Sequence, residues 1–162
     1  MAKFTKGEKM TTPNQSSRLA TGANIVALAG VGLIVYGIMF FIRTFNGFTE
    51  LGLTPELVGG TPDQIRDFSQ NLYNYVVHLQ VAISGFLIAL GMAVIALAIY
   101  GIRRGESWAM WTALLVPGVA VAIGLPLHFP FHFDTFGHLG LIYLDAIILF
   151  VGTGISYQAL KA

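Results

Sequence analysis

Four long apolar stretches constrain this chain more than any other feature of its sequence. They cover about residues 19–42, 76–102, 108–127 and 136–158, and none of them contains a lysine or arginine. A transmembrane helix needs about 20 mostly apolar residues. Only 10% of the chain is charged, whereas soluble domains average about 25%. We therefore predict an all-α membrane protein, with four transmembrane helices in one compact domain over residues 19–162.

The charges indicate how the chain lies in the membrane. Residues 1–18 are polar and are expected to form a mobile tail. The apolar stretch that follows is too long for a signal peptide and is expected to be an uncleaved first span. The positive-inside rule then places both termini in the cytoplasm of a multi-pass protein of the cell membrane. One side carries Lys3, Lys6, Lys9, Arg18, Arg103, Arg104 and Lys161, and the other carries Arg43 and Arg66.

The outer loop, residues 43–75, contains two helix start signals. Thr54-Pro55 precedes a short helix that Gly59-Gly60 can end, and Thr61 with Gln64 has the spacing of a capping box. Apolar residues then recur at helical spacing from Ile65 onward. This pattern predicts an extracytoplasmic amphipathic helix that runs into the second span, either lying on the membrane surface or continuing straight in.

Small residues indicate how the first two spans pack, because they let helices approach closely in lipid. Each span shows them at intervals close to seven residues. The predicted packing positions are Ala23, Ala27, Gly30 and Gly37 in the first span, and Ala82, Ala89 and Ala96 in the second. At the start of the third span, Ser107 is the expected N-cap.

Histidines are concentrated around the connection between the third and fourth spans. His128 and His132 are four residues apart, but Pro130 between them makes a regular helix unfavourable. With Asp134 and His138 they could bind a transition metal such as zinc or copper. The alternative is a set of interfacial histidines within an aromatic girdle of phenylalanines.

A haem site is a second way to use these histidines. His78 lies near the outer end of the second span, at a depth similar to that of His138, and two histidines on facing helices can ligate a b-type haem. The chain has no cysteine, so thiolate ligands and iron–sulfur clusters are excluded.

Asp145 is the sharpest single feature, because it lies near the middle of the fourth span without a basic residue in any span. Desolvation favours its neutral form, and an intramembrane carboxyl is a candidate functional group. His138 is seven residues earlier on the same helix face, so the two could form a polar line about 10 Å long. Alternatively, the carboxyl is hydrogen-bonded inside the bundle. The candidate partners are Asn24, Tyr36, Gln80 and Thr112.

These features leave several functions open. Recognisable catalytic motifs are absent, and the net charge of +1 argues against nucleic acid as a partner. A non-catalytic subunit or scaffold, in contact with lipid and with other membrane subunits or copies of itself, is the main hypothesis. The alternatives are a metal- or haem-binding protein, an oligomeric proton-coupled transporter using Asp145, and a lipid- or quinone-modifying enzyme using His138 and Asp145.

Overall fold

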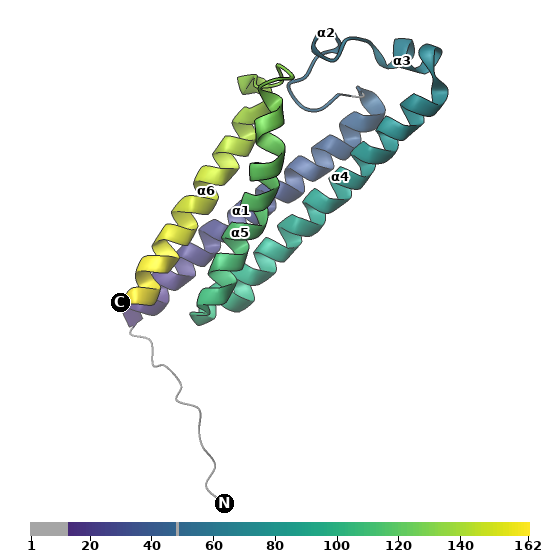
Figure 1. Ribbon diagram of the computed structural model, residues 1–162. Helices are drawn as coiled ribbons and strands as arrows, with labels where there is room; N and C mark the ends of the chain where they lie inside the picture. Colours follow the sequence, from purple (N-terminus) through teal and green to yellow (C-terminus); the bar gives the residue numbers. More distant parts are fainter. Residues whose placement is uncertain (1–12, 48) are drawn as a thin grey trace, which may run out of the picture.

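The computed structural model describes residues 13–47 and 49–162, and within that part it contains helices and no strands. Four helices are long and apolar enough to cross a membrane, as predicted (Figure 1). Two short helices lie in the connection between the first two spans. The long helices are α1 (Pro13–Asn46), α4 (Gln70–Ala96), α5 (Ser107–His128) and α6 (Phe136–Lys161), and the short ones are α2 (Pro55–Val58) and α3 (Pro62–Phe68).

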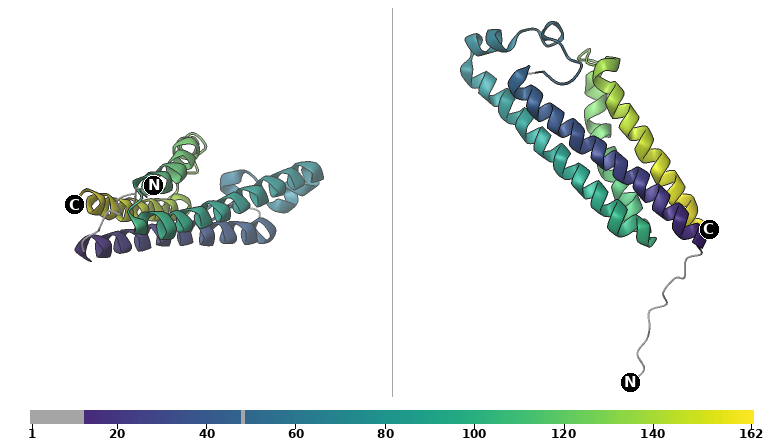
Figure 2. Two further views of the ribbon diagram at one scale, coloured as in Figure 1. Left: turned by 90° about the horizontal axis from the view of Figure 1, so that it is seen from below. Right: turned by 180° about the vertical axis from the view of Figure 1, so that it is seen from behind.

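Helix α1 is the centre of the arrangement, because it packs along both α4 and α6 (Figures 1 and 2). Helix α5 is held less evenly, since all of its buried residues lie between Ala109 and Pro117. It meets α6 near both ends, through the Trp111–Tyr157 ring contact and through a histidine contact described below. The second half of α5 therefore has no buried residue, so α5 packs less closely against the other helices than a compact four-helix bundle would require.

Glycines allow α1 to lie close to its two neighbours. A Cβ atom on Gly30 would come within 2.8 Å of the Gly91 carbonyl oxygen in α4, and one on Gly22 within 2.9 Å of the Gly152 carbonyl oxygen in α6. Side chains at these positions would force the helices apart. The small-residue face predicted for α1 is therefore a packing face, with Gly30 and Gly37 both buried.

The small-residue face predicted for α4 is wrong. Ala89 and Ala96 are exposed, and α4 instead buries Ser84, Gly91 and the following Ala98. Both sets repeat every seven residues, so the repeat alone does not select the face. Close backbone approach at Gly91 selects it.

Helix α1 begins at Pro13, earlier than the predicted start of the first span. Residues 13–18 are thus helical rather than part of a mobile tail, and residues 1–12 of that predicted tail lie outside the described residues. Two long-range hydrogen bonds explain the extension. Gln15 donates to the Ala159 carbonyl oxygen at 3.0 Å, and Arg18 donates to the Gln158 side chain at 2.9 Å.

The connection between α1 and α4 follows its predicted signals in part. The Thr61–Gln64 capping box forms, and Gly59 ends α2 in the left-handed conformation with φ +83°. The amphipathic helix was expected either to lie on the membrane surface or to continue straight into the second span, and the structure breaks it at Ser69. That residue is extended, and its hydroxyl accepts a hydrogen bond from the Leu72 amide at 3.2 Å, which starts α4 as a new helix.

At the opposite end, α4 leads into the tight turn before α5. A π-helical turn spans Leu97–Gly101 and is followed by a 3₁₀ turn, Ile102–Arg104. The N-cap of α5 is Glu106 rather than the predicted Ser107, which is the first helical residue. We call this end, which also holds Pro13 and Ala162, the terminal end, and the end with residues 49–69 and 129–135 the loop end.

Candidate functional site

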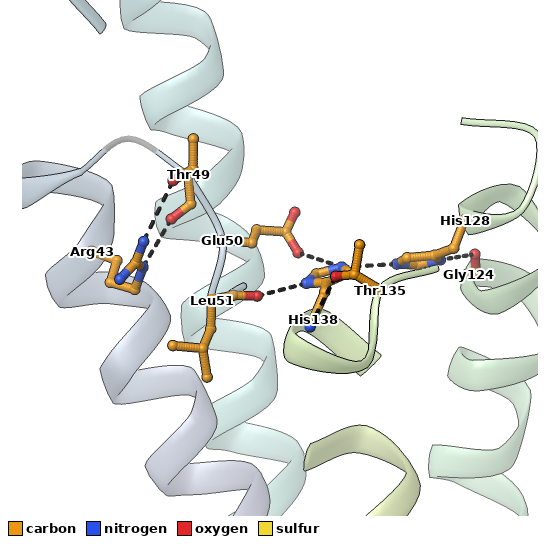
Figure 3. Close-up of polar contacts among 8 residues, drawn as sticks. All are labelled: Arg43, Thr49, Glu50, Leu51, Gly124, His128, Thr135 and His138. Carbon is orange, nitrogen blue, oxygen red and sulfur yellow. Dashed lines mark hydrogen bonds and ion pairs between the residues drawn. The ribbon is translucent and has the colours of Figure 1, made fainter. Parts of the chain in front are cut away.

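Two histidines meet at the loop end of the molecule. His128 is the last residue of α5, and His138 lies in the first turn of α6. Their Nε2 atoms are 3.1 Å apart, and the ring centroids are 5.1 Å apart with the ring planes inclined by 28°. Figure 3 shows the two rings end to end in the gap between their helices. We call them the histidine pair.

The outer nitrogen of each ring is engaged by a backbone carbonyl group. His138 Nδ1 lies 2.9 Å from the Leu51 oxygen, and His128 Nδ1 lies 3.0 Å from the Gly124 oxygen (Figure 3). A carbonyl oxygen can only accept, so both Nδ1 atoms carry the donated hydrogen. In a neutral imidazole the other nitrogen is then an acceptor.

A carboxylate completes the surroundings of the histidine pair. The Oε2 atom of Glu50 is 3.6 Å from His138 Nε2, and Glu50 approaches from the segment that follows α1. Arg43 fixes that segment by donating from Nε to the Thr49 carbonyl oxygen at 3.1 Å. Glu50 was not predicted as a site residue, because no local pattern connects it with histidines almost ninety positions later.

Backbone geometry places residues 49–53 over the start of α6. Thr135 caps α6 by accepting from the His138 amide at 3.3 Å. Gly52 has φ +78°, and the position of its missing Cβ is occupied by the Gly137 backbone. This close approach seals His138, which is only 1% exposed.

The other residues of the predicted metal site do not join the histidine pair. His132 and Asp134 are exposed in the turn between α5 and α6, where His132 adopts φ 59°, and His78 is exposed on α4. Within residues 13–47 and 49–162, no three His, Cys, Asp or Glu side chains form a group that could hold a metal ion. A metal site that uses all five predicted residues is therefore not formed there, and a haem held by His78 and His138 stays a prediction.

Asp145 lies nine residues after the start of α6, half-buried against α1. Its Oδ1 atom fills the space that a side chain on Gly32 would need. Among the described residues, no hydrogen bond or ion pair to its carboxyl group is formed. Two of its predicted partners bond elsewhere: Asn24 accepts from Arg103, and Thr112 donates to the Trp108 carbonyl oxygen.

Two cavities lie away from these residues. One of about 460 Å³ is apolar and lies at the terminal end between Ala93 and Trp108. The other, of about 250 Å³, is polar and lies at the loop end beside the Asp63–Arg66 ion pair. Neither cavity is lined by the histidine pair or by Asp145.

The four apolar helices, joined by short connections and exposing large apolar side chains, indicate a multi-pass membrane protein in contact with lipid. In comparisons with known proteins, no family model, no curated protein and no solved structure matches the chain. Its function is therefore argued from the two polar sites.

Proposed function

We propose that this protein is a non-catalytic subunit of a membrane complex and that Asp145 helps to hold a partner helix. The observation that carries the proposal is the half-buried Asp145 carboxyl group, which has no hydrogen-bond partner among the described residues. It lies nine residues after the start of α6, about 14 Å along the helix axis. At that depth, water is a poor source of compensating hydrogen bonds.

The missing partner is best supplied by another protein. The apolar stretches of this chain contain no lysine or arginine, so a second copy offers no cation at that depth. A different transmembrane helix with a basic or hydrogen-bonding side chain would satisfy the carboxyl group. We therefore propose a complex of different subunits, in which the partner helix supplies the hydrogen-bonding or basic side chain.

An apolar ridge on α1 provides the surface beside Asp145. Its residues are exposed and follow the three- and four-residue spacing of a helix-packing seam. Gly32 directly follows Val31 of this ridge, and its missing side chain leaves the space that the Asp145 carboxyl group occupies. The ridge comprises Leu28, Val31, Val35, Ile38 and Ile42.

The histidine pair supports a non-catalytic role. All four ring nitrogens make contacts inside the chain, to Leu51, to Gly124 and to each other. A general base needs a nitrogen that can reach a substrate. The rings are better suited to holding the loop end together, which the positive-inside rule places outside the cytoplasm.

Two substitutions at Asp145 test the proposal. Asp145→Leu is expected to weaken partner retention about tenfold, because a membrane hydrogen bond contributes roughly 1–2 kcal/mol. Asp145→Asn keeps a polar group and is expected to retain most of the partner. The measurement is the amount of partner protein that co-purifies in native-membrane nanodiscs, with exposed Ile147→Leu as the control on the same helix. Undiminished retention by Asp145→Leu would contradict the proposal.

Asp145→Asn also separates this function from that of an oligomeric proton-coupled transporter. Asparagine does not titrate, so a transporter that uses this carboxyl group would lose proton-coupled flux in liposomes while its assembly is preserved. A subunit that uses Asp145 only for binding would show no such loss.

A further inference from the structure

We propose that the histidine pair binds a single proton between its two Nε2 atoms, with Glu50 as the counter-charge. The bound proton fastens residues 49–53 to the connection between α5 and α6. This proton site is independent of the role proposed for Asp145.

The first step of the argument is the hydrogen-bond balance of the two rings. Both Nδ1 atoms donate to carbonyl oxygens, of Leu51 and Gly124. If both rings were neutral, two lone pairs would face each other across 3.1 Å. That arrangement is repulsive and leaves buried acceptors without donors.

One additional proton removes this conflict. It converts the contact into a charge-assisted N–H···N hydrogen bond, and 3.1 Å is a normal length for such a bond. Two additional protons would place two imidazolium cations in direct contact, which is again repulsive. The geometry therefore favours an occupancy of one.

The second step concerns the charge of that proton. Glu50 Oε2 is 3.6 Å from His138 Nε2, so a carboxylate faces the proton at short range. The His138 ring is buried, whereas the Glu50 side chain is 37% exposed and His128 is half-buried. Two other titratable groups nearby belong to α1. Arg43 is bound to Thr49, and Tyr36 is within electrostatic range of Glu50. On the α5–α6 connection, His132 and Asp134 are exposed.

The third step connects the proton with the loop. His138 binds the Leu51 carbonyl oxygen through the same ring that shares the proton, and neighbouring Gly52 rests on the Gly137 backbone. Loss of the proton at high pH would restore the repulsion between the rings and loosen residues 49–53. Strong acid would also loosen them, by adding a second proton and neutralising Glu50. The fastened state therefore occupies a window of pH.

Nitrogen NMR detects the proton directly. The experiment uses the full chain with ¹⁵N-labelled histidine in lipid nanodiscs. We expect a scalar coupling between the two Nε2 nuclei near neutral pH, and its loss both at high pH and in His138→Ala. Two neutral rings without a coupling, in a protein whose residues 49–53 remain fastened, would overturn the proposal. So would a contact that disappears on chelation and returns with Zn²⁺.

A matched set of variants tests the link to stability. The wild-type melting temperature is expected to fall by about 5 °C when the pH is raised far enough to remove the shared proton and the charged hydrogen bond is lost. In His128→Gln, an amide can donate to a neutral His138, so the fold should persist and this part of the pH response should disappear. A His128→Gln protein with the full wild-type response would refute the shared proton.

Substitutions in the same loop test the counter-charge. Glu50→Gln removes the facing carboxylate, so the high-pH limit of the response should move to lower pH. Glu56→Gln is the control, because Glu56 is a fully exposed acid in the same connection whose pKa is lowered by a hydrogen bond from Thr54. Equal shifts in both variants would rule out Glu50 as the specific counter-charge.

Discussion

Gly91→Leu is expected to separate α4 from α1 and to destabilise the folded protein more than any other substitution considered. A Cβ at position 91 would collide with the Gly30 carbonyl oxygen and lie 2.7 Å from the Ile34 side chain. Backbone on backbone has little freedom to move aside, so the helices must part along their length. We expect a loss of about 3 kcal/mol or more in unfolding free energy and a fall of about 10 °C in melting temperature, measured in nanodiscs.

Gly85→Leu is the matched control for that experiment. Gly85 lies on the same helix, and the position of its missing Cβ has no atom within 4 Å. Leucine has the higher helix propensity, so the melting temperature should stay the same or rise slightly. If both substitutions destabilised the protein equally, the glycines would contribute through something other than the α1–α4 contact.

Gly52→Ala is expected to give the second largest effect and to lift residues 49–53 from α6. Its φ of +78° disfavours alanine, and the new methyl group would overlap the Gly137 carbonyl group. Strain and overlap together should cost about 3 kcal/mol. The buried His138 should then become accessible to an imidazole-modifying reagent, which mass spectrometry of the modified peptide measures.

Gly59→Ala separates strain from overlap. Gly59 has a similar φ of +83°, but no atom lies within 4 Å of its missing Cβ. Gly59→Ala should therefore lower the unfolding free energy by only about 1 kcal/mol and leave His138 inaccessible to the reagent. Exposure of His138 in Gly59→Ala would mean that general loosening of the connection, rather than the Gly52–Gly137 contact, controls access.

Local patterns in the sequence explain why the four long helices could be predicted. Apolar length defines a span, and capping residues such as Thr61 mark helix starts. The packing face of α4 could not be predicted, because its alanines and its true contact residues share one seven-residue repeat. The break at Ser69 was missed as well, since the apolar periodicity runs through it without interruption.

The polar sites, like the helices, could be predicted from the sequence only in part. Asp145 stood out in the sequence because it is the only charged residue within the four apolar stretches. The clustered histidines were also evident, but their pairing was not. Turn geometry leaves His132 exposed, and the partners Glu50 and Leu51 come from the segment after α1, far away in the sequence. Contacts at that sequence separation leave no periodic signal in one chain.

The π-helical turn at Leu97–Gly101 sets the direction in which the chain continues into the 3₁₀ turn and α5. Such a turn contains one more residue than an α-helical turn, and one residue corresponds to a rotation of roughly 100° about the helix axis. Gly101 then meets Ala109, and Arg103 reaches Asn24 on α1. The one extra residue in this turn therefore determines the direction in which the α4–α5 connection leaves the second span. Deleting one residue from the turn would rotate that connection away from α1.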